Sequence, residues 1–488
     1  MSLIDIVNLT FCYDGSYDNI FENVSFQIDT DWKLGFIGRN GRGKTTFLNL
    51  LLGKYKYSGN IYASVSFEYF PYIVEDKTED TIDILNKIGG DYQLWELERE
   101  LSKLKVSNDV LYRPFETLSN GEQTKVLLAA LFLKENSFLL IDEPTNHLDI
   151  EGREQVAAYL KSKKGFILVS HDRMFLDACV DHILSINKAN IEIQRGNFST
   201  WYYNKQLQDN FEIKKNMNLK KEIKRLEAAA RQKAEWSDRV ESTKIGTHQL
   251  DRGHIGHLAA KMMKRSKAIE ARLNREILEK SKLLKNIETA DALKISPLQY
   301  HSQRLIELNK VTLYYGEKTV CRDISFRIEQ GDRIALHGRN GSGKSSIIKL
   351  ICGEEITYTG NFYKGSNLKI SYIPQDTSFL KGSLDDYARV SGIDESLFKA
   401  ILRKLDFSRV QFEKDIADYS AGQKKKVLIA RSLCEKANLY IWDEPLNYVD
   451  VLSRIQIEEL LMEYQPTILF VEHDKAFCEN IATQIVSL

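Results

Sequence analysis

The sequence lacks the features that mark several common protein classes. Its 488 residues include only six cysteines, and no two of them form a C-x-x-C pair. This scarcity argues against zinc, iron–sulfur and disulfide frameworks and fits a reducing cytosol. No apolar run approaches the ~18 residues that a membrane helix needs. The N-terminus, MSLIDIV, lacks the basic and then apolar order of a secretory signal. We therefore expect a cytoplasmic protein with no membrane partner.

The chain as a whole also has no net charge, because 68 Lys and Arg balance 68 Asp and Glu. Residues 203–300 depart from this balance, with 22 basic and 13 acidic side chains, a net of +9. The rest of the chain must then carry −9. A hydrophobic fraction of 43% excludes a fully disordered chain, and the length predicts two to four domains.

The most informative feature that is present is an internal duplication. Four motifs recur in the same order at offsets of 300 to 302 residues. They are GRNGRGKTT at Gly38 and GRNGSGKSS at Gly338, SNGEQTKVLLA at Ser119 and SAGQKKKVLIA at Ser420, IDEPTNHLD with Asp142 and WDEPLNYVD with Asp443, and the His171 and His473 motifs VSHDRMF and VEHDKAF. The chain therefore contains two homologous units, predicted as domains 1–202 and 302–488.

The segment between the two units, 203–301, has a different character. No proline occurs between Pro144 and Pro297, and the glycines between 203 and 300 (Gly246, Gly253 and Gly256) cluster near the midpoint of the segment. This pattern predicts two helices, about 203–239 and 258–287, joined as an antiparallel hairpin with a basic tip at about 242–258. At 1.5 Å per residue, each helix would be roughly 45–55 Å long.

Two glycine-rich segments fit the phosphate-binding pattern G-x-x-x-x-G-K-[ST]. Each follows a short apolar strand (34–37 and 334–336) and precedes a helix-like run, which predicts an α/β fold. Backbone N–H groups at such a helix N-terminus converge on phosphate oxygens, and the lysine reaches the terminal phosphates. The predicted ATP-binding residues are Gly38, Asn40, Gly41, Arg42, Gly43, Lys44, Thr45 and Thr46 in the first loop, and Gly338, Asn340, Gly341, Ser342, Gly343, Lys344, Ser345 and Ser346 in the second.

An Asp-Glu pair follows a four-residue apolar run in each unit. The first acid of each pair, Asp142 or Asp443, can hold Mg²⁺ through water beside Thr45 or Ser345. The second acid, Glu143 or Glu444, can act as general base on the attacking water. A histidine also ends a later apolar strand in each unit. A single histidine there is usually structural, but this ordered set favours a catalytic contact with the γ-phosphate, from His171 and His473.

The segments SNGEQ and SAGQ resemble the signature motif of ATP-binding cassette (ABC) ATPases. In that family the signature serine and glycine bind the γ-phosphate of ATP held by the other cassette. The resemblance implies two composite sites and adenine-stacking aromatics at Tyr13 and Tyr315. Site one would combine Lys44, Thr45, Asp142, Glu143 and His171 with Ser420 and Gly422. Site two would combine Lys344, Ser345, Asp443, Glu444 and His473 with Ser119 and Gly121.

The two units depart from the family pattern in different ways. The family places a glutamine ligand of Mg²⁺ after the strand that follows the phosphate-loop helix. Gln375 fits this position, but Tyr72 occupies it in the first unit. The signature leucine is Leu118 in one unit and Tyr419 in the other. We expect two inequivalent sites, with site one slower.

Tandem cassettes joined by a charged helical linker resemble the ABC-F class, whose members bind ribosomes. The resemblance implies that the partners are the 70S ribosome with its 23S rRNA, the P-site tRNA and large-subunit proteins near the E site. It implies no DNA partner and a chain that is monomeric in solution. A basic hairpin gains affinity for RNA by displacing counterions. The RNA-contacting candidates are Lys244, His248, Arg252, His254, His257, Lys261, Lys264 and Arg265.

The resemblance is narrower within ABC-F. Housekeeping members often insert an arm in the first cassette, but 47 positions separate Tyr72 from Ser119 and 45 separate Gln375 from Ser420, which leaves no room for one. Segments such as KAEWS and LYIWDEPLNYVDV resemble the antibiotic-resistance proteins of Gram-positive bacteria, of the Lsa type associated with lincosamides, pleuromutilins and streptogramin A. The implied cycle is closure on ATP, release of bound antibiotic, and departure after hydrolysis.

Three other functions compete with this interpretation. A general ABC-F translation factor would rescue stalled ribosomes without drugs. The ATPase subunit of an exporter would require a membrane partner, and it leaves the basic hairpin without a role. A DNA-repair ATPase is disfavoured, because the six scattered cysteines cannot build the zinc-bearing insertions of such proteins.

Overall fold

The computed structural model describes residues 2–13, 19–146, 148–187, 190–242, 293–316, 318–339 and 341–488, with further single or paired positions at 261, 264, 268–269, 271–272 and 275. The chain divides into two compact units. One contains Met1–Trp201 together with Asp291–Leu488, and the other is Tyr202–Ala290. Within the first of these units, the first cassette denotes residues up to 201 and the second cassette denotes residues from 293.

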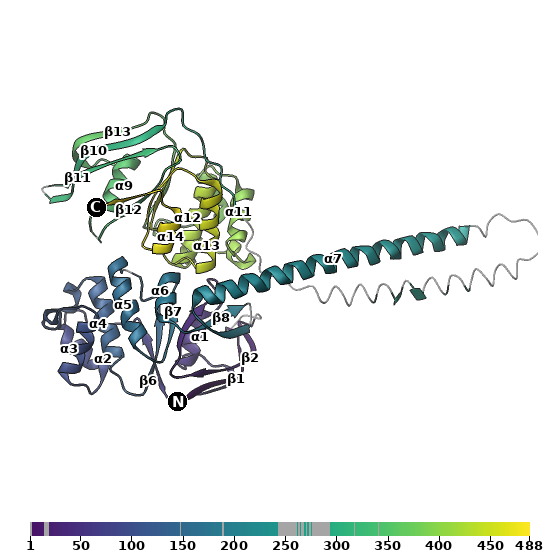
Figure 1. The fold of residues 1–488 in the computed structure, drawn as a ribbon, viewed down its shortest axis with the longest axis horizontal. Coiled ribbons are helices and arrows are strands. Elements are labelled where there is room, and N and C mark those ends of the chain that lie inside the picture. Colours follow the sequence, from purple (N-terminus) through teal and green to yellow (C-terminus); the bar gives the residue numbers. More distant parts are fainter. Residues whose placement is uncertain are drawn as a thin grey trace, which may run out of the picture. The chain divides into compact units, whose positions relative to one another are not determined.

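The first cassette is built on a six-stranded sheet with the order β5-β6-β7-β3-β8-β9. Figure 1 labels β6, β7 and β8 of this sheet. Neighbouring strands are parallel except for β8 and β9. The strands are β3 (Lys33–Ile37), β5 (Ser66–Phe70), β6 (Ser137–Asp142), β7 (Phe166–Val169), β8 (His182–Asn187) and β9 (Asn190–Arg195). A separate antiparallel sheet contains β1 (Leu3–Phe11), β2 (Phe21–Asp29) and β4 (Ser58–Tyr62).

Six helices accompany these sheets in the described part of the first cassette. They are α1 (Lys44–Leu51), α2 (Thr81–Gly89), α3 (Leu94–Lys103), α4 (Asn120–Leu131), α5 (Ile150–Ser162) and α6 (Arg173–Cys179), with 3-10 turns at Asn108–Tyr112 and Phe115–Thr117. The fully buried Phe47 of α1 packs edge-on against Phe21 of β2 and Phe36 of β3. Burial of each such side chain contributes roughly 1.5–3 kcal/mol. This core fixes α1, and with it the loop that precedes α1.

The second cassette repeats this plan. Its parallel sheet has the order β14-β15-β16-β12-β17, and its antiparallel sheet has the order β11-β10-β13. The strands are β10 (Arg304–Tyr315), β11 (Lys318–Glu329), β12 (Arg333–His337), β13 (Thr357–Lys364), β14 (Ile370–Ile373), β15 (Leu439–Asp443), β16 (Ile468–Val471) and β17 (Gln484–Ser487). The helices are α9 (Lys344–Cys352), α10 (Leu384–Val390), α11 (Glu395–Lys404), α12 (Ala421–Cys434), α13 (Val451–Tyr464) and α14 (Lys475–Ile481), with 3-10 turns at Arg409–Glu413 and Ile416–Asp418.

Two hydrophobic cores meet at the parallel sheet of the second cassette. Ile347 and Ile351 of α9 share one core with β10, β11 and one face of β12, β15 and β16. Trp442 and Phe470, which point to the opposite face of the same sheet, belong to the core of α10 to α14. Alternate residues of a strand face opposite sides, so a sheet covered on both faces needs continuous apolar runs. The runs 138–141, 166–169, 439–442 and 468–471 are such strands, as their sequence predicts.

The long helix α7 covers Phe198–Ser242 and begins in the first cassette. Its 45 residues correspond to about 67 Å of helix. It begins five residues before the predicted start, because the Asn197 side chain accepts a hydrogen bond from Thr200 N at 3.1 Å and starts the helix there. The predicted tip, about 242–258, lies almost entirely outside the described residues. Helical conformation recurs at 261, 264, 268–269, 271–272 and 275, within the predicted second helix. None of the helical segments that the structure describes combines the length and apolar character of a membrane span.

Candidate nucleotide-binding sites

Each phosphate loop lies at the carboxyl end of a central strand, the position where α/β sheets bind ligands. The loop 38–43 connects β3 to α1, and the loop 338–343 connects β12 to α9. In each loop the lysine ammonium donates to two loop carbonyls. Lys44 Nζ lies 2.7 Å from Gly38 O, and Lys344 Nζ lies 2.8 Å from Gly338 O. Burial lowers the pKa of both lysines. A phosphate group here would give each buried ammonium an anionic partner.

The glycine before each lysine is required by the backbone. Gly43 and Gly343 have φ values of +92° and +96°, in the left-handed region that side chains disfavour. A Cβ atom on Gly43 would also lie 2.6 Å from Ile20 Cγ2, and one on Gly343 would lie 2.9 Å from Val320 Cγ1. These residues cap the helices that start at the lysines, so their N–H groups lie at an anion-binding helix end.

The first acid of each Asp-Glu pair lies beside the phosphate-loop hydroxyl. Thr45 Oγ1 donates to Asp142 Oδ2 at 3.3 Å, and Ser345 bonds to Asp443. Burial raises the pKa of both aspartates. Asp443 Oδ1 is buried and has no hydrogen-bond partner among the described residues. A hydroxyl, a carboxylate and phosphate oxygens are ligands that Mg²⁺ accepts, so these residues fit the metal.

Each second acid faces the predicted histidine. Glu143 Oε1 lies 3.4 Å from His171 Nε2, and Glu444 Oε1 lies 3.6 Å from His473 Nε2. Both glutamates adopt positive φ, +51° and +49°, a strained conformation for a residue with a side chain. Such strain persists only where surrounding contacts hold it and clusters at functional sites. The repeated strain therefore marks the same backbone position in both cassettes.

The two glutamates differ in their electrostatic environment. Burial, followed by the charge of Asp142, raises the pKa of Glu143 to about 8. Burial acts in the same direction on Glu444, but bonds from His473 and Gln375 hold its pKa below the usual range. Gln375 Nε2 lies 2.8 Å from Glu444 Oε2. Tyr72, the residue that replaces this glutamine in the first cassette, is exposed. The two cassettes therefore differ in the surroundings of the predicted catalytic acids, and the expected difference in turnover between the sites stays a prediction.

The signature residues start helices that point toward the sites. Ser119 is the N-cap of α4, and Ser420 is the N-cap of α12. Each serine also forms a reciprocal capping box, with Glu122 or Gln423. The positive end of each helix therefore lies at the predicted γ-phosphate contact.

A cavity of about 950 Å³ brings together residues predicted for site two. Its lining includes residues from both cassettes: Ser119 and Gly121 from the first, and Gly343, Lys344, Ser345, Gln375, Glu444 and His473 from the second. Asp443 bonds to Ser345 at the same place. The cavity therefore joins the two groups of residues that the family resemblance assigns to this site.

The phosphate loop of the first cassette meets the second cassette at site one. Asn40 Nδ2 donates to Tyr448 O at 2.8 Å, and Arg42 Nη2 lies 3.2 Å from Asp406 Oδ1. A Cβ atom on Gly422 would lie 2.2 Å from Tyr448 O and 2.7 Å from Asn40 Nδ2. The signature glycine of the second cassette therefore has to be a glycine, because the first phosphate loop and the 448 carbonyl approach it so closely.

The remaining predicted residues differ in their exposure and contacts. Tyr13 is partly exposed, and its hydroxyl lies 2.7 Å from Thr46 Oγ1 on the phosphate-loop helix. Tyr315 is exposed near the end of β10. Ser346 lines the site-two cavity, as do Gly341 and Gln375. Ser342 Oγ is buried without a hydrogen-bond partner among the described residues.

Other candidates fall outside the residues that the structure describes. These are Asn340 and the linker residues Lys244, His248, Arg252, His254, His257 and Arg265. Lys261 and Lys264 are described, as exposed residues in helical conformation. The RNA-binding role of all these linker residues stays a prediction.

Sequence reasoning missed two polar residues near the predicted metal ligands. Tyr69, on β5, donates to Asp142 Oδ2 at 3.0 Å. Lys425, on α12, is buried and donates to Pro374 O at 3.1 Å, beside Gln375. Tyr69 lies in the strand beside the acidic strand β6, so a correct strand pairing would have found it. The sequence gives no comparable indication for Lys425, because a run of three lysines predicts side chains exposed to solvent.

Comparisons with known proteins identify the family of this chain. A family model described as ABC transporter matches residues 21–146 and 321–447. The chain therefore belongs to the ABC transporter family. Because it has two cassettes in tandem and its relatives match over nearly its whole length, it belongs to the ABC-F class of that family. It is an ATP hydrolase.

Several curated relatives match nearly the whole chain. Ribosome protection protein VmlR of Bacillus subtilis (strain 168) is 29% identical, over 98% of this chain and 85% of that protein. ATP-binding protein Uup of Buchnera aphidicola subsp. Acyrthosiphon pisum is 29% identical, over 99% and 80%. Probable ATP-binding protein YheS of Escherichia coli (strain K12) is 26% identical, over 93% and 74%.

Solved structures share the fold at low identity. The archaeal ribosome recycling factor aABCE1, in complex with ribosomal stalk protein aP1, has a TM-score of 0.65 at 19% identity, covering 98% of this chain and 87% of that chain. A structure described as RNase-L Inhibitor has a TM-score of 0.62 at 19% identity, with the same coverage. At this identity the likeness supports the tandem-cassette fold alone.

Proposed function

We propose that this protein is a ribosome-protection ATPase. In the ATP-bound closed form it binds the 70S ribosome at the E site, directs the linker tip toward the P-site tRNA and peptidyl-transferase centre, and promotes release of bound antibiotics. The observation that carries the proposal is the site-two cavity, whose walls come from both cassettes. A ligand that fills such a cavity contacts both halves and stabilises their closure by its differential affinity for the closed state.

Hydrolysis ends this closure in the proposed cycle. Lys344 binds the terminal phosphates, and Glu444 removes a proton from the attacking water. Ser345 and Asp443 would hold Mg²⁺, which when bound would supply withdrawal of charge from the phosphate oxygens. The signature serine Ser119 contacts the γ-phosphate from the other cassette. Loss of that phosphate removes a contact shared by the cassettes, and the protein dissociates.

The linker charge supports a ribosomal partner. Residues 203–300 carry a net of +9 in a chain that is neutral overall. RNA is a dense polyanion that releases counterions when basic side chains approach it. VmlR, a relative over 98% of the chain, is itself a ribosome protection protein. The same considerations support a cytoplasmic location and contacts of the linker with 23S rRNA and the P-site tRNA.

The function is tested first by trapping the closed state. The double variant Glu143→Gln, Glu444→Gln should bind ATP without turnover and co-sediment with 70S ribosomes, with affinity falling steeply between low and high salt. The matched control is the same double variant with Lys44→Ala and Lys344→Ala added, which should not co-sediment. Absence of ribosome association in the trapped variant, with ATP binding intact, would refute the proposal.

Drug susceptibility separates protection from general translation rescue. Expression in a sensitive host should raise the inhibitory concentrations of lincosamides, pleuromutilins or streptogramin A, and the double Glu→Gln variant should not. Ribosome association with unchanged susceptibility would favour the translation factor. Co-fractionation with membranes, without ribosomes, would instead indicate an exporter subunit.

A further inference from the structure

Two arginines occupy matching positions outside the predicted motifs. Arg153 on α5 and Arg454 on α13 each lie four residues after the aspartate that caps the helix. Two kinds of loop lie near them, the interface loops (residues 144–149 and 445–450) and the histidine loops (residues 170–172 and 472–474). Both arginines have side chains that are about one-tenth exposed, although each carries a permanent charge. A buried charge of this kind requires defined partners.

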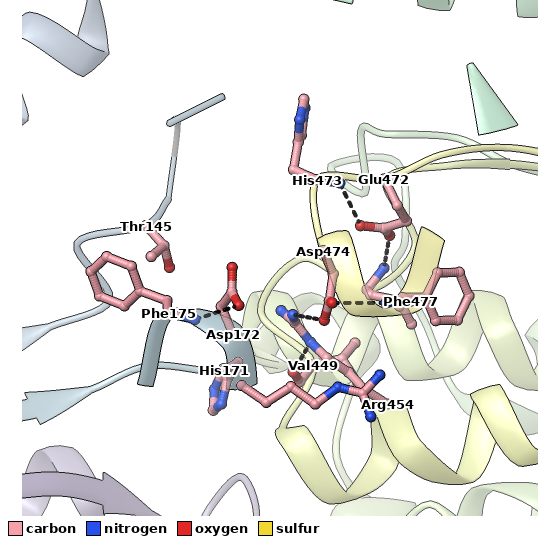
Figure 2. Close-up of polar contacts among 12 residues, drawn as sticks. Thr145, His171, Asp172, Phe175, Val449, Arg454, Glu472, His473, Asp474 and Phe477 are labelled. Carbon is pink, nitrogen blue, oxygen red and sulfur yellow. Dashed lines mark hydrogen bonds and ion pairs between the residues drawn. The ribbon is translucent and has the colours of Figure 1, made fainter. Parts of the chain in front are cut away.

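Each guanidinium joins the interface loop and the histidine loop of its own cassette. Arg153 Nε donates to Leu148 O at 3.2 Å, and Arg153 Nη1 donates to Asp172 Oδ2 at 2.9 Å. In the second cassette Arg454 donates to Val449 O at 2.9 Å and to Asp474 Oδ2 at 3.2 Å. Figure 2 shows Arg454 bonded to Val449 and Asp474.

The aspartates fix the loops that carry the histidines. Asp172 Oδ1 accepts from Phe175 N at 3.0 Å, and Asp474 Oδ1 accepts from Phe477 N at 3.0 Å, so both are helix N-caps (Figure 2). Each aspartate directly follows the predicted γ-phosphate histidine. An arginine that holds the aspartate therefore restrains the backbone of the histidine.

One guanidinium also crosses to the other cassette. Arg153 Nη1 donates to His473 O at 3.2 Å, and Arg153 lines the site-two cavity together with His473. Arg454 reaches the first cassette through the interface loop that it holds. The Val449 carbonyl that accepts from Arg454 follows Tyr448, whose carbonyl accepts from Asn40 Nδ2 of the first phosphate loop at 2.8 Å. Each arginine is thus linked to both ATP sites.

We propose that Arg153 and Arg454 are positioning residues that couple the two ATP sites. Arg153 holds the histidine loops of both cassettes, and Arg454 holds the His473 loop of site two and the interface loop that meets the phosphate loop of site one. The proposal rests on the proposed roles of the two composite sites. Because a displacement of about 1 Å can cost on the order of 100-fold in rate, loss of either arginine should slow both sites.

The experiment measures each site separately by silencing the other. With site one silenced by Glu143→Gln, Arg153→Gln should lower kcat for ATP at site two by on the order of 10- to 100-fold, with KM changed by less than about threefold. With site two silenced by Glu444→Gln, the same Arg153→Gln change should lower kcat at site one by a similar factor, because Arg153 also holds Asp172 beside His171. Arg454→Gln should likewise slow both sites.

A control variant separates this coupling from general loss of the interface. Lys475 Nζ pairs with Glu154 Oε1 at 3.2 Å, also across the two cassettes, but both side chains are exposed and neither bonds to a histidine. Lys475→Gln should leave both sites within about twofold of the parent, as expected for a surface pair. Arg153→Lys keeps the charge and one donor, and it should recover part of the site-two rate.

Loss of rate at both sites decides the outcome. Slowing confined to one site by Arg153→Gln, or no slowing, would overturn the proposal, and so would a site-two loss in Lys475→Gln as large as in Arg153→Gln. Should Arg153→Gln fail to fold by its thermal melt, the Arg153→Lys rates decide in the same way. If neither Glu→Gln background retains turnover in the arginine wild type, the assignment of the two sites themselves fails instead.

Discussion

The buried ion pair between Lys426 and Asp450 allows a sharp test of what stabilises the second cassette. Lys426 Nζ lies 2.6 Å from Asp450 Oδ2 and also donates to Leu405 O at 2.9 Å. The two side chains are 3% and 1% exposed. Asp450 caps α13 through Ser453 N, so the pair links the signature helix α12 to the helix after the interface loop.

Removing one partner of this pair leaves a charge in the interior. In Lys426→Met, Asp450 keeps its bonds from Ser453 but loses its only cationic hydrogen-bond partner among those described, and the Leu405 carbonyl loses a donor. Breaking a buried pair in this way costs about 3–5 kcal/mol. For a cassette-sized unit in urea, that free energy corresponds to a midpoint lowered by about 1–2 M.

The duplication supplies the matched control. Lys125 occupies the same position on α4, but its Nζ donates to the neutral Gln155 Oε1 at 2.5 Å and the side chain is partly exposed. Lys125→Met should therefore cost less than about 1.5 kcal/mol, the net value of an ordinary hydrogen bond.

Urea unfolding followed by tryptophan fluorescence measures the difference, because Trp442 is fully buried in β15 of the second cassette and Trp32 stacks on His182 in the first. Equal midpoints for Lys426→Met and Lys125→Met would refute the reasoning. Adding Asp450→Asn to Lys426→Met should recover part of the loss, since no unpaired charge then remains in the interior.

Three further substitutions allow shorter tests. Glu100→Gln should destabilise the first cassette in thermal melts at neutral pH, because Lys163 and other donors outweigh the effect of burial and hold the pKa of Glu100 at about 2. Since the carboxylate pKa is depressed, this stabilisation is present above pH 4.5 and should vanish as the pH falls through about 2, where wild type and variant should melt alike. Asp406→Asn removes the partly exposed pair with Arg42 and leaves the phosphate loop unchanged, so it should weaken ATP-driven closure by a few-fold at low salt, with no effect at 1 M salt, as measured by ATP affinity. Tyr72→Gln, with site two silenced, should raise site-one turnover, and an unchanged or lower rate would show that Tyr72 does not limit this site.

The sequence predicted those parts of the fold that local patterns determine. Apolar runs indicated the central strands, and the glycine-lysine junctions indicated the loops that start α1 and α9, because a left-handed glycine before a helix is a local requirement. The long helix α7 followed from the absence of proline and glycine over its length. Its start was missed by five residues, since the Asn197 cap lies in a segment without helical periodicity.

Contacts between distant segments could not be obtained in this way. Arg153 donates to the backbone carbonyl of His473, 320 residues away. Because every residue has a backbone carbonyl, the sequence does not indicate which one accepts. Lys426 and Lys125 occupy equivalent positions, yet Lys426 is buried in an ion pair with an aspartate, whereas Lys125 donates a hydrogen bond to a glutamine. The choice depends on how α12 and α4 pack, which is a property of the whole core rather than of the motif.

The two cassettes share their motifs but not their interface. Arg42 in the first phosphate loop pairs with Asp406 of the second cassette. The equivalent positions, at offsets of 300 and 301, are Ser342 and Lys105, which cannot form an ion pair. The second phosphate loop instead places Arg339 at 3.9 Å from Glu151 of the first cassette, in a longer and more exposed pair than Arg42 with Asp406. An exposed pair contributes little attraction, so we expect closure at site two to depend more on ATP itself.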